Sequence, residues 1–136
     1  MLKLIYGPKG FGKTKIILDD VNAAAKKAKG NVVLITDEKI NSVDIDIDVR
    51  CVNTNEYDIH STDAFEGFVK GLLAGNSDIE YLFIDGILRI TNDNLISLEK
   101  FIGGLNKLNE ENGLNIELTI SSTKENLPKY LLSYLQ

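Results

Sequence analysis

A glycine-rich segment near the start of the chain has the residue types and spacing of a phosphate-binding loop. Residues 7–14 read GPKGFGKT and match the pattern G-x-x-x-x-G-K-[ST] in full. Glycines let the backbone turn tightly, so that successive N–H groups point into one concavity that holds phosphate oxygens. Lys13 can reach the β- and γ-phosphates of a nucleotide, and the Thr14 hydroxyl can bind Mg²⁺. We expect this nucleotide-binding loop to consist of Gly7, Pro8, Lys9, Gly10, Phe11, Gly12, Lys13 and Thr14.

A second candidate site residue stands at the end of an apolar run. Residues 80–85 read EYLFID and predict a buried strand that ends in the carboxylate of Asp85. A carboxylate at such a strand end can hold Mg²⁺ beside a nucleotide, directly or through water. The next residue is Gly86, so the chain does not place a catalytic glutamate directly after this aspartate.

The residues that could position a water molecule follow another strand. Residues 31–36 read NVVLIT, a continuous apolar run typical of a strand covered on both faces, and Asp37 and Glu38 come next. A carboxylate near the γ-phosphate can align water for attack. We predict that Glu38 is catalytic together with Lys13, and that Asp37 is the alternative to Glu38. An exposed acidic turn without a catalytic role is the other interpretation.

The elements that must position these residues alternate along the chain. We expect strands at residues 2–6, 31–36, 43–52, 80–85 and 115–121, and helices at residues 14–29, 62–74, 93–112 and 127–135. Apolar and charged residues alternate over 43–52, which indicates a half-exposed edge strand of which the second half alone could be paired. This order predicts an α/β fold with three αβα layers and a mostly parallel central sheet of about five strands.

The loop and the two strands that carry Glu38 and Asp85 resemble the RecA-like ATPases, which belong to the additional-strand group of P-loop NTPases. GPKGFGKT is then the Walker A motif and YLFID the Walker B motif. The resemblance implies ATP, or another NTP, and Mg²⁺ as cofactors, with Thr14 and Asp85 as the metal ligands. It also puts Glu38 at the position of the water-orienting glutamate, just past the strand that follows the phosphate-loop helix.

The same resemblance places the strand at 115–121 between the phosphate-loop strand and the Walker B strand. Its end would then face the γ-phosphate as a sensor, through Ser121, Ser122 and Thr123. RecA-like proteins often carry Asn or Gln at this place. A Ser/Thr cluster that caps the last helix is therefore the alternative interpretation.

Three other P-loop classes match the sequence less well. The start, LIYGPKGFGKT, is also similar to thymidine kinases, but those carry a cysteine-ligated zinc and the chain has one cysteine. Residues 123–126 are similar to the guanine-reading motif [NT]-K-x-D, but Asn126 replaces its aspartate, and Leu88 stands where GTPases have glycine. A small-molecule or protein kinase would need an acceptor pocket or lid, for which residues 39–61 are the only candidate.

Composition bounds the function classes. A chain of 136 residues predicts one domain over residues 1–136, and 43% hydrophobic with 26% charged residues is ordinary for a soluble protein. The net charge of −5 gives no strong nucleic-acid signal, and no apolar run is long enough to span a membrane. We expect a cytoplasmic protein, because the apolar start is too short for a signal peptide. Cys51 is expected to be a buried small residue.

These residues together predict a protein that binds Mg·ATP and hydrolyses it slowly. The alternative is a nucleotide-dependent switch or partner-binding module that does not hydrolyse ATP, which the hydroxyl sensor and the scarcity of arginine favour. Arg50 and Arg89 are the only arginines. Arg89 lies four residues after Asp85, within reach of a nucleotide, but a surface arginine is the better interpretation. Self-association and a protein partner both stay open.

Overall fold

The computed structural model describes residues 2–135. The strands are β1 (Lys3–Gly7), β2 (Asn31–Thr36), β3 (Val49–Asn53), β4 (Ile79–Asp85) and β5 (Asn115–Ser121). The α-helices are α1 (Lys13–Lys27), α2 (Thr62–Gly75), α3 (Ile87–Thr91), α4 (Glu99–Asn112) and α5 (Lys129–Leu132). Short 3₁₀ segments are η1 (Ser42–Asp44), η2 (Thr54–Tyr57) and η3 (Lys124–Asn126). No helix within residues 2–135 is both long and apolar enough to cross a bilayer.

The strands form one sheet in the order β1-β5-β4-β2-β3, and every neighbouring pair is parallel. The predicted α/β class and parallel sheet are confirmed. β5 lies between β1 and β4, which is the position expected for residues 115–121. All strands run the same way, so the loops that follow β1, β2 and β4 lie together at the carboxyl ends of the strands. Parallel α/β folds bind ligands at this end of the sheet.

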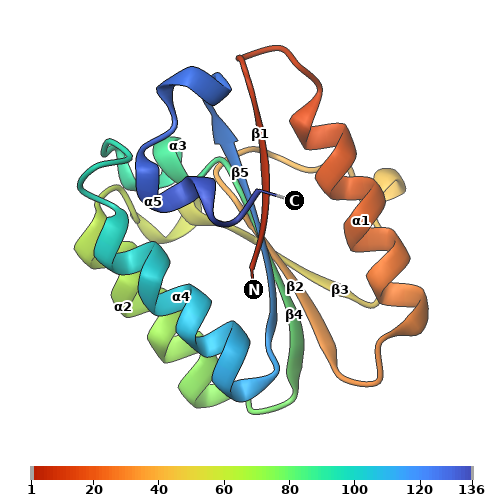
Figure 1. Ribbon diagram of the computed structural model, residues 1–136. Coiled ribbons are helices and arrows are strands. Elements are labelled where there is room, and N and C mark those ends of the chain that lie inside the picture. Colours follow the sequence, from red (N-terminus) through yellow and green to blue (C-terminus); the bar gives the residue numbers. More distant parts are fainter. Residues whose placement is uncertain (1, 136) are drawn as a thin grey trace.

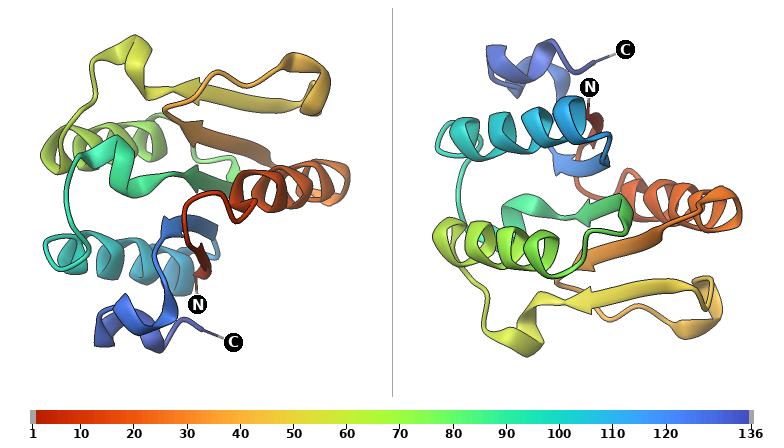
Figure 2. Two further views of the ribbon diagram at one scale, coloured as in Figure 1. Left: turned by 90° about the horizontal axis from the view of Figure 1, so that it is seen from above. Right: turned by 90° about the horizontal axis from the view of Figure 1, so that it is seen from below.

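Helices flank the sheet on both faces (Figure 1). Helix α1 covers one face through a stripe of apolar residues that contains Ile17, Val21 and Ala24, packed against residues such as Leu34 and Phe83. Helices α2 to α5 contribute to the core on the other face. Figure 2 shows β3 at one edge of the sheet and the C-terminal segment beside β1 at the other. The result is a helix–sheet–helix layering that is compatible with a three-layer αβα fold.

The helix predicted at 93–112 begins later, at Glu99. Asn92 adopts a left-handed conformation with φ of 51°, which ends α3. The Asp93 and Asn94 side chains then accept hydrogen bonds from the backbone N–H groups of Asn94 and Ser97, at 2.8 and 3.0 Å. Such side chains compete with helical hydrogen bonds, so the apolar spacing over 93–98 was a misleading helix signal.

The terminal helix predicted at 127–135 is also shorter than expected and spans only Lys129–Leu132. Pro128 precedes it in an extended conformation with ψ of 153°, rather than standing in its first turn. Leu127 is extended as well, because a residue before proline is sterically kept out of the helical region. The prediction of a helix that starts at Leu127 is therefore wrong.

The strand predicted at 43–52 forms only in its second half, as β3. The Asn22 side chain of α1 donates to the Asp44 carbonyl at 2.9 Å and accepts from the Asp46 N–H at 2.8 Å. These bonds hold the first half as a loop, in which Ile47 is 96% exposed. Cys51 is also exposed, so its predicted burial is wrong, because β3 is an edge strand.

A buried carboxyl group lies in the middle of β5. Glu117 is 7% exposed, its Oε1 atom is 3.5 Å from Lys3 Nζ, and its Oε2 atom has no hydrogen-bond partner within residues 2–135. Burial raises the pKa of Glu117 to about 8; the neighbouring Asp20 carboxylate adds to this rise, and the Lys3 ammonium opposes it. The folded protein therefore holds a proton on Glu117 at neutral pH.

We expect the free energy of unfolding to decrease as the pH rises from about 5 to about 8. Over this range the unfolded chain releases the Glu117 proton that the folded chain retains, so ionisation favours unfolding. The expected decrease is at most about 4 kcal/mol, because one pKa unit corresponds to about 1.4 kcal/mol and the range covers about three pH units. Urea denaturation of Glu117→Gln over the same pH range should lack it. Glu111→Gln, at an exposed position on α4, should retain the decrease, and a Glu117→Gln profile like the wild type would contradict the assignment.

Candidate functional site

The glycine-rich segment forms a tight loop between β1 and α1. Gly10 and Gly12 have φ values of 85° and 87°, a left-handed conformation that L side chains rarely adopt. The Phe11 N–H donates to the Pro8 carbonyl at 3.1 Å, which closes the turn. Gly12 is the N-cap of α1, so the first N–H groups of this helix lack intrahelical acceptors and are available to an anion.

Lys13 lies across the loop and is only 8% exposed. Its Nζ atom donates to the carbonyl oxygens of Gly7 and Pro8, both at 3.0 Å. Burial lowers the pKa of Lys13, the nearby charge of Arg89 lowers it further, and the Asp85 carboxylate opposes both effects. The ammonium group is therefore held by neutral acceptors inside the concavity that the sequence predicts for phosphate.

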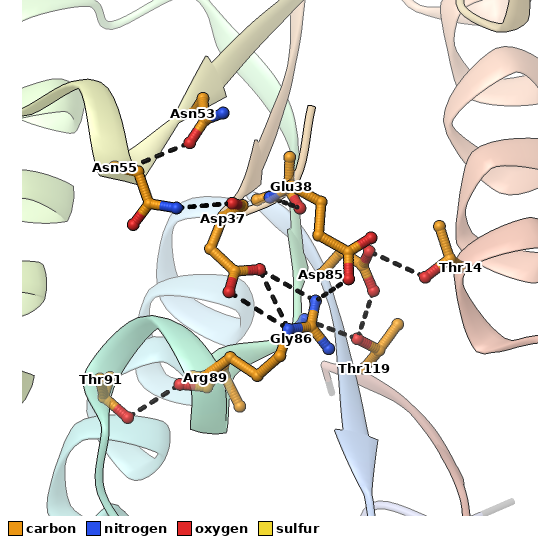
Figure 3. A network of polar contacts seen from close by, with 12 residues as sticks. Thr14, Asp37, Glu38, Asn53, Asn55, Asp85, Gly86, Arg89, Thr91 and Thr119 are labelled. Carbon is orange, nitrogen blue, oxygen red and sulfur yellow. Dashed lines mark hydrogen bonds and ion pairs between the residues drawn. The ribbon is translucent and has the colours of Figure 1, made fainter. Parts of the chain in front are cut away.

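Asp85 ends β4 as predicted and is bonded from two other elements (Figure 3). The Thr14 hydroxyl donates to Asp85 Oδ2 at 3.1 Å, and the Thr119 hydroxyl donates to Oδ1 at 2.7 Å. Thr119 also accepts a hydrogen bond from the Gly86 N–H at 2.7 Å. Thr14 and Asp85, the two predicted metal ligands, are thus brought together, and Thr119 fixes the carboxylate from β5.

Sequence reasoning missed Thr119. It precedes the predicted sensor Ser121 by two residues, and because side chains alternate along a strand these two residues lie on the same face of β5. The two-residue spacing from Ser121 was therefore the sequence signal that could have identified Thr119 as a site residue. Ser121 itself is exposed at the end of β5, and no hydrogen bond within residues 2–135 joins its side chain to the loop or to Asp85. The segment after β5 is tied to the loop through the backbone, since the Ser122 N–H donates to the Gly7 carbonyl at 3.0 Å.

Arg89 joins the ends of β2 and β4 (Figure 3). Its Nε atom donates to both carboxylate oxygens of Asp37, at 3.1 and 3.2 Å. Its Nη2 atom lies 3.0 Å from Asp37 Oδ1 and 3.3 Å from Glu38 Oε1. Arg89 is exposed, as predicted, with 39% of its side chain accessible, but its guanidinium group is bonded to two carboxylates at the site.

Asp37 and Glu38 differ in how firmly they are held. Asp37 has three contacts with Arg89, its carbonyl accepts from the Asn55 side chain at 2.8 Å, and its side chain is 18% exposed. The Glu38 side chain is 52% exposed and makes one ion pair, the longest in this network. Glu38 is therefore the carboxylate whose side chain can move with the smaller loss of contacts.

The donors at Thr14 and Asp85 suit Mg²⁺. This ion keeps several water ligands and is held through one or two protein oxygens together with substrate phosphates. A hydroxyl and a carboxylate within hydrogen-bond distance of each other, beside the loop, provide that kind of donor set. Residues 2–135 contain no group of three or more His, Cys, Asp or Glu side chains that could hold a metal ion without other ligands.

Comparison with known proteins adds no functional information. No protein-family model matches the chain, and no curated protein matches it either. Function must therefore be inferred from the chain's own residues: the loop at 7–14, the Thr14–Asp85 contact, and the carboxylates that Arg89 joins.

Proposed function

We propose that the protein binds Mg·ATP through its residue 7–14 loop and slowly hydrolyses the γ-phosphate, as a P-loop NTPase of RecA-like type. One observation carries the proposal. The Thr14 hydroxyl and the Asp85 carboxylate, 71 residues apart in sequence, lie within hydrogen-bond distance of each other next to the buried Lys13. Chance glycine-rich turns have no reason to bring a lysine, a hydroxyl and a carboxylate to one place.

The binding step uses groups that already point to the loop. The N-terminal N–H groups of α1, a helix of 15 residues, and the positive end of its dipole favour phosphate oxygens. Lys13 would exchange the carbonyls of Gly7 and Pro8 for phosphate oxygens, which replaces neutral acceptors by charged ones and so strengthens its hydrogen bonds. Mg²⁺, when bound, would neutralise phosphate charge, held by Thr14 and by the carboxylate that Thr119 positions.

The hydrolytic step needs one aligned water molecule. Glu38 would orient the water oxygen towards the γ-phosphorus and take one of its protons. A new bond forms between that oxygen and the γ-phosphorus, while the bond to the bridging oxygen of the leaving diphosphate breaks. Lys13 would stabilise the charge that develops on the phosphate oxygens. We expect slow turnover, because Glu38 is paired with Arg89 and must break this contact before it can align water.

A thermal-shift panel tests the proposal. The wild-type protein is melted with ATP, GTP, CTP, UTP, ADP or orthophosphate, each with Mg²⁺ and with EDTA. A ligand at 100 times its Kd that binds only the folded state adds about 2.7 kcal/mol to stability, so ATP should raise the melting temperature, and more so with Mg²⁺. Absence of a shift with every nucleotide would refute the proposal. Binding without phosphate release would instead favour a nucleotide-dependent switch.

A further inference from the structure

We propose that Arg89 recognises the terminal γ-phosphate of a nucleotide bound to its own chain. Asp37 is the positioning residue that holds the Arg89 guanidinium in place. This inference rests on the proposed function and assigns the residue that would distinguish ATP from ADP. Arg89 stands on α3, the short helix that begins two residues after Asp85. It is thus attached to the same strand end as the proposed Mg²⁺ ligand.

The turn after β4 directs Arg89 back over the site. Gly86 has φ of 84° and its carbonyl accepts from the Ile90 N–H at 3.0 Å, so α3 starts at once. A Cβ atom at Gly86 would lie 2.2 Å from Arg89 Nη2, which means that the guanidinium lies directly against the Gly86 backbone. A side chain at position 86 would therefore displace the guanidinium from this place.

The charges at this end of the sheet mean that a bound terminal phosphate needs cations facing it. Asp37, Glu38 and Asp85 place three carboxylates near Arg89 at the carboxyl end of the sheet (Figure 3). Lys13 is the second cation at the site. A terminal phosphate adds further negative charge and would be repelled by the carboxylates unless cations face it. The charge of Arg89 is close enough to lower the pKa of Lys13, so a phosphate group bound beside Lys13 would also be attracted by Arg89.

The bonding of Arg89 leaves it able to take another acceptor. A guanidinium has five N–H donors, and within residues 2–135 no hydrogen bond or ion pair involves the Nη1 atom. Asp37 binds the Nε edge through both of its oxygens, whereas Glu38 contributes the single 3.3 Å contact. A phosphate oxygen would displace Glu38 rather than Asp37, since the Glu38 contact is the longer and more exposed one.

This exchange links recognition to chemistry. When the terminal phosphate pairs with Arg89, the Glu38 carboxylate loses its cation and becomes available to orient water. ADP lacks the γ-phosphate, so Glu38 would stay paired with Arg89 when ADP is bound. Arg89 thereby touches the reacting group, and Asp37 acts only through Arg89.

Paired affinities for two nucleotides test this inference. Affinities for Mg·ADP and for the β,γ-imido analogue of ATP, which is not hydrolysed, are measured for the wild type and for Arg89→Gln. The analogue should bind Arg89→Gln at least about tenfold more weakly than the wild type, a loss typical of one charge-assisted hydrogen bond, whereas ADP affinity should change less than about twofold. Arg50→Gln, at an exposed position on β3, is the matched control and should change neither.

The outcomes separate the two proposals. An equal loss for both nucleotides, or no loss for either, would overturn the role of Arg89. Failure of the wild type to bind either nucleotide would overturn the proposed function instead. If melting without nucleotide shows that Arg89→Gln is unfolded, Arg89→Lys replaces it. Arg89→Lys keeps the charge but loses the planar guanidinium that can bind two oxygens at once. It should therefore show a smaller loss of affinity, and for the analogue alone. An equal change in affinity for both nucleotides would again overturn the inference.

Discussion

Replacement of Lys13 by alanine is expected to lower the affinity for Mg·ATP by about 100-fold or more, since a hydrogen bond to a charged group contributes about 1.5–3 kcal/mol and the ammonium can make more than one. Of the two lysines in the residue 7–14 loop, Lys9 is exposed and Lys13 is buried. The Lys13 Nζ atom already contacts two carbonyl oxygens of the loop. Without it the phosphates would rely on N–H groups, on Mg²⁺ and on the proposed contact with Arg89. Isothermal titration with Mg·ATP measures the loss.

The control for this prediction lies on the same helix. Lys15, whose side chain is 83% exposed and paired with Asp19, carries the same charge two residues further along α1. Lys15→Ala should bind Mg·ATP as the wild type does. Lys13→Gln removes the charge but keeps an N–H donor in the loop, so it separates loss of the charge from loss of all side-chain hydrogen bonding there. Unchanged affinity in both Lys13 variants would refute the phosphate-binding loop.

Replacement of Glu38 by glutamine should leave Mg·ATP affinity within a few-fold of the wild type and reduce phosphate release by about 10²–10⁴-fold, the usual contribution of a positioned base. Glutamine has nearly the same shape as glutamate, but it cannot take a proton from the attacking water. Because Glu38 is half exposed and makes one ion pair, its replacement should not disturb the fold. Phosphate release at saturating Mg·ATP, with affinity measured in parallel, checks the prediction.

Two further variants make the result on Glu38 specific. Glu56→Gln changes an exposed carboxylate on η2 and should release phosphate at the wild-type rate. Asp37→Asn weakens the hydrogen bonds that hold Arg89 in position. It should therefore lower ATP affinity more than it lowers turnover at saturating ATP. If Glu38→Gln remained active at saturating ATP while Asp37→Asn was inactive, Asp37 would be the base.

Local patterns were sufficient for most of the sheet. The apolar runs at 31–36, 80–85 and 115–121 correspond to β2, β4 and β5 within one residue, because buried parallel strands need apolar side chains on both faces. The helix after the residue 7–14 loop was also located, within two residues at its end, by its apolar stripe and by Gly30. These signals depend on neighbours a few residues apart and can be read directly from the sequence.

The errors in the element bounds occur where polar side chains or a proline overrode the apolar spacing. Asn94 and its neighbour bind backbone N–H groups and delay α4, Pro128 delays α5, and Asn22 reaches from α1 to hold the loop before β3. The first two effects are local and detectable as Asp-Asn and Leu-Pro pairs. The third joins residues 22 positions apart, so periodicity in the strand itself cannot reveal it.

The residue 7–14 loop could be located from the amino-acid sequence, because the turn requires glycines at fixed spacing and because the lysine and threonine follow them directly. The apolar runs also located Asp85 and Glu38 at or just after strand ends. The side chains that surround these residues follow from the way the chain folds. Insertion of β5 between β1 and β4 brings Thr119 to Asp85 across 34 positions, and the turn at Gly86 brings Arg89 to Asp37 across 52. These contacts depend on the order of the strands in the sheet and on the backbone conformation at Gly86. Neither feature produces a periodic pattern in the sequence around the residues that are brought together.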